Sequence, residues 1–449
     1  MSDIFSGGRT RASQGSPLPS PSVSPLATQV VASELVRLVT CGSVDDGKST
    51  LIGRLLYDTK QIFVDQMEHI EETSERRGDG YVNLALLTDG LRAEREQGIT
   101  IDVAYRSFVT PRRRFQLADA PGHVQYTRNM VTGASTADVA IVLLDARKGV
   151  VEQTRRHSYL AATLGTPHLV FAVNKMDLVD FDEERFRAIE IELRDLASRL
   201  GAKDTAAVPI SALRGDNVVD RSAAMAWYDG APLLGHLETV EIAGDRNLAD
   251  RRFPVQWVIR PMSEEHHDYR GYAGQVAGGV WRAGDDVLVL PSGARTRVAS
   301  VDTADGPLEE AGPGRSVTIR LQDDLDVGRG DLLCDPEDVP IVARRLEATV
   351  CWMSETPLRP GARVGVKQTT RTVRAVVEEI TAVLDVTELE DDPARGELAL
   401  NDIGTVVLRL SGPLLVDPYA QNRATGSFIL IDEATNNTVA AGMVRSAQA

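Results

Sequence analysis

Cysteine is scarce in this sequence, and its placement argues against two kinds of stabilising cross-link. Only Cys41, Cys334 and Cys351 occur among the 449 residues, and no two of them form a CxxC pair. Disulfide frameworks and structural zinc sites need more cysteines or closer spacing, so we expect neither. This cysteine usage fits a reducing compartment, and we therefore expect a cytoplasmic protein.

Long apolar runs and an excess of positive charge are also missing. No stretch of about 18 apolar residues is present, so we expect no membrane-spanning helix. The 65 acidic residues against 49 basic ones give a net charge of −16. That sign argues against broad binding of nucleic acid, although a local basic patch stays open. The hydrophobic share of 43% is globular, and the length leaves room for about three domains.

The segment 1–33 differs from the rest of the chain because it is rich in Ser, Pro and Gly and lacks apolar periodicity. Such a composition buries too little apolar surface to offset the entropy of ordering, so we predict a flexible tail. An organelle transit peptide is the alternative, because Arg9 and Arg11 are present and acidic residues are scarce.

The segment 34–245 alternates apolar runs with helical patterns. Continuous apolar runs at 35–41, 139–144 and 169–173 are typical of strands that are covered on both faces. One charged stretch carries a single apolar stripe at spacings of three and four, formed by Phe186, Ile189, Leu193, Leu196 and Leu200. The segment is therefore predicted to be an α/β domain with a mostly parallel, doubly wound sheet.

Short alternating patterns replace the helical ones after this segment. Apolar residues alternate with others at 253–259, 317–321 and 346–352, and Gly or Pro recurs between them. Short strands punctuated in this way predict two all-β barrel domains, 246–340 and 341–449. The acidic stretch 385–396 is expected to be a surface loop.

The strongest local motif is GSVDDGKS at 42–49, which follows an apolar strand and precedes a helical pattern. This is the P-loop pattern in its required context. Glycines let the backbone N–H groups face phosphate oxygens, and the helix dipole adds to that field. Lys48 can reach the β- and γ-phosphates, and the Ser49 hydroxyl can bind Mg²⁺. The predicted phosphate-binding residues are Gly42, Ser43, Val44, Asp45, Asp46, Gly47, Lys48, Ser49 and Thr50.

Three shorter motifs follow in the order that a nucleotide hydrolase requires. DAPG at 119–122 comes after the apolar FQLA segment, NKMD at 174–177 ends a buried run, and SAL at 211–213 follows VPI. Taken singly, DAPG could be a surface turn and NKMD could be a helix N-cap. The predicted residues are Asp119, Ala120, Pro121, Gly122, Asn174, Lys175, Met176, Asp177, Ser211, Ala212 and Leu213.

These side chains suit a guanine nucleotide. The Asp177 carboxylate can accept hydrogen bonds from N1–H and the exocyclic amine of guanine, which adenine does not offer together. Asn174 suits the acceptor edge of the base, and the Lys175 stem can stack on the ring. Sites built on such hydrogen bonds discriminate by roughly 10⁴-fold or more, because a mismatched ligand leaves buried groups unpaired. GTP and Mg²⁺ are therefore the expected ligands, with Asp119 near the metal.

Thr100 in QGITI and His123 directly after DAPG complete the predicted site. A threonine in a mobile loop can bind Mg²⁺ and contact the γ-phosphate. The His123 imidazole could orient the attacking water, with a buried structural histidine as the alternative. We therefore predict Lys48, Thr100 and His123 as catalytic residues and Ser49, Thr100 and Asp119 as metal ligands.

Other features are interpreted as structural. His266 and His267 lack metal-site spacing and are expected in an exposed loop. The basic run 112–114 is expected at a hairpin tip. Cys41 is expected to be a small buried residue rather than a nucleophile.

The motifs and several long segments resemble known GTPase families. The four nucleotide motifs are similar to those of translational GTPases, which join a G domain to two β-barrels. CGSVDDGKSTLIGRLLYDTK, DGLRAEREQGITIDVAYRSF, GHVQYTRNMVTGASTADVAIVLLDARKGV, VNKMDLVDF, RATGSFILID and TVAAGM resemble the family of GTPase large subunits of bacterial ATP sulfurylase. The likeness extends from about residue 34 to 445. Ala120 departs from it, since many of these subunits carry Thr there.

The resemblance implies a coupled reaction. A smaller catalytic subunit would bind ATP and sulfate and form adenosine 5′-phosphosulfate and diphosphate, while GTP hydrolysis on this chain would drive that step. It also implies a heterodimer or an assembly of heterodimers, with no nucleic acid and no membrane as partner. Some relatives carry a fused adenylylsulfate kinase; with one P-loop in this sequence, we expect that activity to be absent.

Two alternatives remain at this point. An elongation factor that delivers aminoacyl-tRNA has the same three-domain layout, and the negative net charge only argues weakly against it. A regulatory GTPase without a coupled reaction is the other, although it leaves the long segments unexplained.

Overall fold

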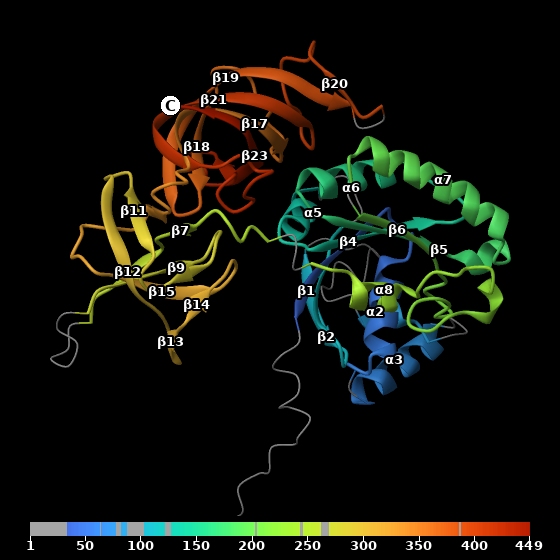
Figure 1. Ribbon diagram of the computed structural model, residues 1–449. Coiled ribbons are helices and arrows are strands. Elements are labelled where there is room, and N and C mark those ends of the chain that lie inside the picture. Colours follow the sequence, from blue (N-terminus) through green and yellow to red (C-terminus); the bar gives the residue numbers. More distant parts are fainter. Residues whose placement is uncertain are drawn as a thin grey trace, which may run out of the picture.

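The computed structural model describes residues 34–62, 64–77, 82–87, 103–121, 127–202, 204–242, 246–261, 269–385 and 388–449. The predicted tail, Thr100, Gly122, His123 and the pair His266–His267 lie outside these ranges. Three bodies of secondary structure follow one another along the chain (Figure 1).

The first body is built on a six-stranded sheet with the order β2-β3-β1-β4-β5-β6. All neighbours are parallel except β2 and β3, which form an antiparallel hairpin with the basic run 112–114 at its tip, as predicted. The strands are β1 (Leu35–Gly42), β2 (Ala104–Val109), β3 (Arg114–Asp119), β4 (Val139–Asp145), β5 (His168–Asn174) and β6 (Asp204–Pro209).

Helices cover both faces of this sheet because its central strands are apolar on both sides. In β4 every residue is buried; Ile141 packs on one face and Val142 on the other. The first face carries α2 (Lys48–Asp58) and α8 (Leu233–Thr239), and the second carries α5 (Thr127–Ala134), α6 (Glu152–Thr163) and α7 (Glu183–Arg199). The prediction of a mostly parallel, doubly wound sheet is confirmed.

The helix α7 forms where the apolar stripe predicts it. Phe186, Ile189 and Leu193 of the stripe are buried against the sheet. The Asp182 side chain caps the helix by accepting a hydrogen bond from Glu184 N, which satisfies one of the free N–H groups of its first turn. The helix therefore carries the predicted stripe, with Leu200 as its C-cap.

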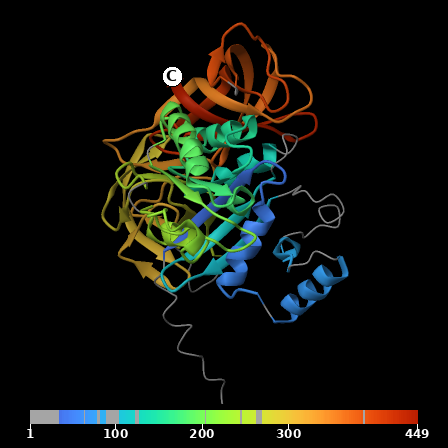
Figure 2. The same ribbon diagram turned by 90° about the vertical axis from the view of Figure 1, so that its right-hand side faces the viewer.

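Beyond α2 lie α3 (Val64–Arg77) and the 3₁₀ turn η2 (Leu84–Leu87), on the outer side of the domain (Figure 2). The turn η2 packs directly on the α2 backbone. A Cβ on Gly53 would lie 2.2 Å from Leu84 O, so only glycine permits this approach. Two further 3₁₀ turns in the described part of the domain are η4 (Met176–Val179) and η5 (Ala223–Met225).

The second body is an eight-stranded barrel-like sheet with a short two-stranded addition. Val287, Val298 and Ile319 are among the apolar residues that fill its interior. Its strands are β7 (Arg252–Pro254), β8 (Trp257–Ile259), β9 (Gly271–Gln275), β11 (Asp286–Leu290), β12 (Ala294–Thr303), β13 (Gly306–Leu308), β15 (Ser316–Leu321) and β16 (Leu332–Cys334), with β10 (Trp281–Arg282) paired to β14 (Glu310–Ala311).

The alternating pattern at 253–259 does not form one strand. The chain changes partner after Val255: β7 pairs with β16, whereas β8 pairs with β9. As a result Phe253 and Val255 are buried, but Trp257 is 67% exposed instead of continuing the apolar face. A change of strand partner is not encoded in the period-two pattern, because that pattern is the same for either partner.

The third body is a seven-stranded sheet in which six strands close into a barrel and β20 extends from β19 outside the ring. The sheet order is β18-β22-β23-β17-β21-β19-β20, and β18 also pairs with β19, which closes the ring. Its strands are β17 (Ile341–Trp352), β18 (Arg363–Gln368), β19 (Arg371–Asp385), β20 (Glu390–Asp392), β21 (Ile403–Val416), β22 (Ser427–Ile431) and β23 (Thr438–Gln448). The β-barrel fold class is confirmed, while the boundaries near 245 and 340 stay predictions.

The acidic stretch 385–396 is more than the predicted surface loop. Residues Glu390–Asp392 form β20, which pairs with the end of β19 in an antiparallel hairpin. Charged side chains are compatible with this position because β20 is an edge strand whose residues largely face water. The neighbouring Glu388 also accepts a hydrogen bond from Arg199 at the end of α7.

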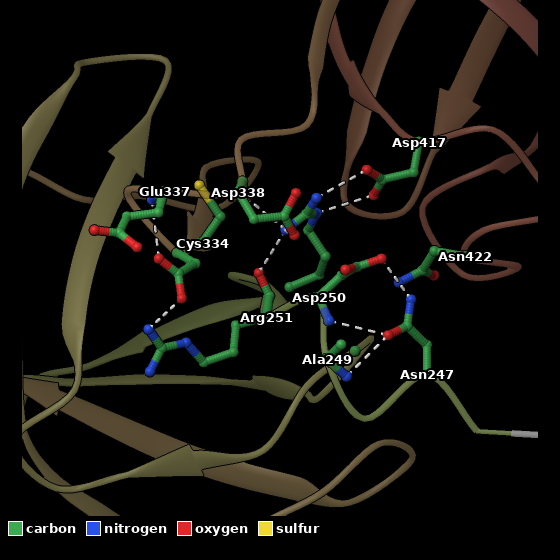
Figure 3. A network of polar contacts seen from close by, with 12 residues as sticks. Asn247, Ala249, Asp250, Arg251, Cys334, Glu337, Asp338, Asp417 and Asn422 are labelled. Atoms are coloured by element: carbon green, nitrogen blue, oxygen red, sulfur yellow. Dashed lines mark hydrogen bonds and ion pairs between the residues drawn. The ribbon is translucent and has the colours of Figure 1, made fainter. Parts of the chain in front are cut away.

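A buried ion pair joins the two barrels. The Arg252 side chain is fully buried, and its Nε and Nη2 each lie 3.0 Å from one oxygen of Asp417. Arg252 Nη1 also donates to Asp338 O at 2.9 Å and lies 3.1 Å from the Asp338 carboxylate. Figure 3 shows Asp417 and Asp338 in this polar network, with Asn247 and Asp250 nearby. The network fixes the start of the second body against the third.

The third body also packs on the first body, the predicted G domain, on the face that carries α5 and α6. Tyr419 donates to Leu164 O at 2.6 Å, at the end of α6. Arg423 Nη2 donates to Ser135 O at 2.8 Å, just after α5. Apolar residues of this barrel join the G-domain core cluster, namely Cys351, Met353, Leu384, Ile403 and Met443. The loop 417–425 thus contacts both other bodies.

Candidate nucleotide-binding site

The P-loop connects β1 to α2 at the carboxyl edge of the sheet. Gly47 has φ +95°, in the left-handed region that favours glycine, and lies directly before the first residue of α2. A Cβ on Gly47 would lie 2.4 Å from Asn174 Nδ2, so the loop backbone runs against the second nucleotide motif. Ser49 and Thr50 stand in the first helical turn, where N–H groups have no partner within the helix.

The P-loop lysine is buried within its own loop. Lys48 Nζ donates to Gly42 O at 2.9 Å and to Ser43 O at 3.0 Å. Burial lowers the pKa of the Lys48 ammonium, although the carboxylates of Asp119 and Asp46 act in the opposite direction. A buried ammonium surrounded by carbonyl oxygens is well placed to stabilise additional negative charge.

Two carboxylates flank this lysine. Asp46 Oδ2 accepts from Ser43 N at 2.8 Å, and burial raises the pKa of Asp46. Asp119 ends β3 and is 3% exposed, in register with Thr40 on β1 next to the P-loop. The buried Ser43 Oγ has no hydrogen-bond partner in the described structure. The P-loop therefore contains both the Ser43 hydroxyl, which has no partner in the described structure, and the Lys48 ammonium.

Asn174 joins three of the four motifs. Its Nδ2 donates to Asp46 O in the P-loop at 2.8 Å, and its Oδ1 accepts from Ala212 N in the SAL segment at 2.9 Å. The residue itself is 2% exposed and ends β5. One side chain thus fixes the phosphate loop relative to the SAL segment.

The remaining NKMD residues lie beside it. Lys175 has φ +64° and donates to Asp45 O, and its Nζ lies 3.1 Å from Asp145 Oδ2. Met176 is buried in the core, so it holds the motif in place without facing a ligand. The Asp177 side chain is 6% exposed, and Arg214 Nε lies 4.0 Å from its Oδ2.

The SAL segment turns tightly after β6. Ser211 and Ala212 are buried, whereas Leu213 is 40% exposed. Ser211 Oγ accepts from Arg214 N at 3.2 Å, which stabilises the turn. Its position next to Asn174 brings the third and fourth motifs together, although they are far apart in the sequence.

Ala120 and Pro121 are buried directly after β3, so the DAPG motif starts from a fixed position. Gly122, His123 and Thr100 lie outside the described residues, and their predicted roles stay predictions. Within the described ranges, the geometry brings together the P-loop, Asp119, NKMD and SAL. It thus places the base-binding and phosphate-binding candidates at one edge of the sheet.

Sequence reasoning missed two residues beside this site. Asp145 ends β4 in register with Asn174, and it contacts both Arg147 and Lys175. Burial acts to raise the pKa of Asp145, but the hydrogen bonds from Arg147 and Lys175 outweigh it and lower that pKa. A carboxylate at the end of a buried run was a usable signal for Asp145. Arg54, which contacts the SAL segment, carries no motif signal at all.

The free thiol of Cys41, next to the P-loop, is made unreactive by its buried environment. Burial raises the pKa of Cys41 to about 12, so the thiolate is a negligible fraction near neutral pH. The interpretation of Cys41 as a small buried residue is confirmed by its zero exposure.

Comparisons with known proteins agree with this geometry. Residues 33–248 match the elongation factor Tu GTP binding domain, and residues 345–445 match the GTP-eEF1A C-terminal domain-like family. The chain is 52% identical to sulfate adenylyltransferase subunit 1 of Bacteroides fragilis over 413 residues, which cover 92% of this chain and 86% of that relative. The chain belongs to the sulfate adenylyltransferase subunit 1 family.

Further relatives support membership of this family. Sulfate adenylyltransferase subunit 1 of Cellvibrio japonicus is 52% identical, with 92% of this chain and 86% of the relative covered. The bifunctional enzyme CysN/CysC of Mycobacterium tuberculosis is 58% identical. The matched region covers 91% of this chain and 67% of that longer relative. The resemblance drawn from the long segments is confirmed, and the likeness to elongation factors is that of a more distant family.

The family assignment shows a GTP-binding domain in this chain. Among the described residues, no helix has both the length and the apolar character needed to cross a bilayer.

Proposed function

We propose that this chain is the GTP-hydrolysing subunit of a heteromeric ATP sulfurylase that works in the cytoplasm. A smaller catalytic subunit would adenylate sulfate with ATP to give adenosine 5′-phosphosulfate and diphosphate. GTP hydrolysis on this chain would drive that unfavourable step. The identity of 52% over 92% of the chain to a subunit named for this reaction carries the proposal.

The P-loop residues are proposed to bind the phosphates of GTP. Lys48 already lies against the carbonyls of Gly42 and Ser43, so a γ-phosphate could compete for its ammonium without a large movement of the side chain. The buried Ser43 Oγ, which has no hydrogen-bond partner among the described residues, and the N–H groups at the start of α2 add further donors in this loop.

Mg²⁺ fits the donor set at this edge of the sheet. Ser49 in the first turn of α2 and the buried carboxylate of Asp119 provide oxygen ligands of the kind that Mg²⁺ prefers. We propose that these two residues and Thr100 hold the ion directly or through water. When bound, the ion would neutralise charge on the phosphates.

The base is proposed to bind between NKMD and SAL. Asp177, whose side chain is 6% exposed, would accept from N1–H and the exocyclic amine of guanine. Lys175 would stack its stem on the ring, while its Nζ stays held by Asp45 and Asp145. Ser211, Ala212 and Leu213 would support the base through their backbone groups, because Asn174 holds Ala212 N in place.

His123 is proposed to orient the water that attacks the γ-phosphate. It follows DAPG directly, and Asp119, Ala120 and Pro121 fix the start of that motif. Orientation of the nucleophile is the main task of such a residue, since phosphoryl transfer depends mostly on positioning and on charge stabilisation.

Coupling to the smaller subunit requires that the GTP and GDP states bind it differently. The segment that carries His123 leads directly into α5, and the residues after α5 contact Arg423 of the third body. A change at the γ-phosphate therefore has a short structural route to the barrels. An elongation-factor role is the weaker alternative, because the close relatives are named for sulfate adenylyltransferase.

The decisive experiment combines the full chain with the small catalytic subunit and measures sulfate-dependent release of diphosphate. We expect GTP to stimulate this release and a non-hydrolysable GTP analogue not to sustain it. Lys48→Ala should abolish the stimulation, whereas Lys367→Ala, a change of an exposed lysine on β18, should leave it intact. Diphosphate release that is indifferent to GTP, together with tight binding of aminoacyl-tRNA, would overturn the proposal.

A further inference from the structure

Arg54 connects the P-loop helix to the SAL segment. It lies on α2, six positions after Lys48, and its guanidinium contacts two consecutive carbonyls of that segment. Nε donates to Ala212 O at 3.3 Å, and Nη2 donates to Leu213 O at 2.6 Å. The side chain is 18% exposed, so these hydrogen bonds are partly shielded from water.

The guanidinium is held in place from several sides. Asp58, one turn further along α2, lies 3.6 Å from Arg54 Nη1. The Tyr57 ring lies 5.7 Å from the guanidinium carbon, within range of a cation–π contact. Gly215 has φ +88°, and a Cβ there would stand 3.6 Å from Arg54 Cδ, so the SAL turn wraps closely around this side chain. Arg54 is therefore a fixed support.

Holding two carbonyls also fixes the N–H groups of the same peptides. A trans peptide is planar, and its N–H points opposite to its C=O. Because the carbonyls of Ala212 and Leu213 point toward Arg54, the N–H groups of Leu213 and Arg214 point away from α2. Arg214 N then donates to Ser211 Oγ at 3.2 Å, and Ala212 N donates to Asn174 Oδ1 at 2.9 Å.

We propose that Arg54 is a positioning residue for guanine recognition. By holding the carbonyl of Ala212, it keeps the N–H group of Leu213, which lies in the same peptide, preorganised as a donor for the O6 oxygen of guanine, and by holding the carbonyl of Leu213 it fixes the turn around that donor. Adenine has an amino group at that position, which donates and cannot accept, so fixed donors reject it. This inference rests on the proposed GTP site and adds to it a residue outside the four motifs.

An arginine suits this task better than a lysine. Its planar fork presents several N–H groups in a fixed geometry and can serve two acceptors at once. Because α2 begins at Lys48, the same rigid helix supports the phosphates at one end and the base segment further along. The helix α2 thereby adds a second tie between the two halves of the proposed nucleotide site, besides the one made by Asn174.

The test measures nucleotide affinities of the full chain carrying Arg54→Ala or Arg54→Lys. The probes are GDP, inosine diphosphate, which keeps O6 but lacks the exocyclic amine, and ADP. For Arg54→Ala we expect about tenfold weaker binding of both GDP and inosine diphosphate, the effect of losing roughly one well-made hydrogen bond. ADP affinity and the rate of hydrolysis at saturating GTP should not change. Arg54→Lys should lie between Arg54→Ala and the wild type.

Arg76→Ala is the matched control. Arg76 also pairs with a carboxylate one turn away on its helix, Glu72 at 3.8 Å, but it is 68% exposed and contacts no base segment. Its affinities should equal those of the wild type. Asp177→Ala should weaken GDP more than inosine diphosphate, which separates recognition of the amine from recognition of O6.

Two results would overturn the inference. Unchanged GDP affinity in Arg54→Ala would show that the SAL donors need no support from α2. An equal loss for GDP and ADP, with a lowered melting temperature, would show a general structural role instead. A wild-type chain that binds no GDP would refute the proposed site itself, and this result appears before any substitution is made.

Discussion

The buried ion pair between the barrels allows a quantitative prediction. Asp417→Ala removes the carboxylate that contacts both Nε and Nη2 of Arg252 at 3.0 Å and also accepts from Thr425 Oγ1 at 2.6 Å. The fully buried guanidinium stays charged and loses its closest counter-ion. Removing one partner of a buried pair costs about 3–5 kcal/mol. Because Asp338 still contacts Nη1, we expect the lower end, about 3 kcal/mol.

The assay is urea-induced unfolding of the full chain, with the unfolding free energy of the barrel transition compared between variants. The control is Arg297→Ala, which breaks a pair of similar length, 2.8 Å to Asp286, whose side chains are 59% and 64% exposed. Exposed pairs of this kind contribute about 0–1 kcal/mol. The double variant Arg252→Met, Asp417→Leu should recover much of the loss, since it leaves no buried charge. A loss below about 1 kcal/mol for Asp417→Ala would refute the reasoning.

Three further predictions concern the nucleotide site and its surroundings. Gly47→Ala should lower GDP affinity at least about tenfold, because its Cβ would lie 2.4 Å from Asn174 Nδ2. The control is Gly201→Ala, which is also at positive φ but has no atom within 4 Å of its Cβ, and which should leave the GDP affinity measured by titration unchanged. Equal effects of the two substitutions would contradict this prediction. Asp177→Asn should shift preference from GTP toward xanthosine triphosphate in competition binding, because the carboxylate acceptor is replaced; unchanged GTP affinity would argue against its role. Burial lowers the pKa of His157 in the folded chain to about 3. Below about pH 6.5 the unfolded chain therefore binds more protons than the folded chain, and the free energy of unfolding decreases as the pH is lowered. His157→Leu should therefore lose about 2 kcal/mol less than the wild type in urea unfolding between about pH 7 and about pH 5, and equal losses would exclude the histidine as the cause.

The G-domain strands were predictable from the sequence because their apolar runs are continuous and end at motif residues. The runs 139–144 and 169–173 match β4 and β5 to within one residue at each end. The meeting of Asn174 with the P-loop also follows from sequence, since parallel strands place their carboxyl ends at one edge. The ordered motifs therefore predicted which segments meet at that edge, and the described residues of all four motifs do lie together there.

Other features depend on information that a local pattern does not contain. The contact of Arg54 with Ala212 joins residues 158 positions apart and depends on the rotational phase of α2. The exposure of Trp257 depends on which strand pairs with β8. Arg252 alone gives no sign that it will be buried, because its partner Asp417 lies 165 positions away. Pairing across long separations is set by topology.

The contacts of loop 417–425 with the G domain have a consequence for sequence variation. Tyr419 and Arg423 bind main-chain carbonyls of Leu164, Ser135 and Ala137, which every residue type provides. The exposed side chain of Ser135 can therefore change without loss of its bond to Arg423, whereas Leu164 and Ala137 are buried in the core cluster and are restrained by packing. These bonds themselves depend on the position of the backbone, while residue type at the junction is restricted by packing, since a Cβ on Gly165 would lie 3.2 Å from the Tyr419 ring. Sequence change that keeps this linkage is therefore expected at Ser135 and not at Leu164, Gly165 or Ala137.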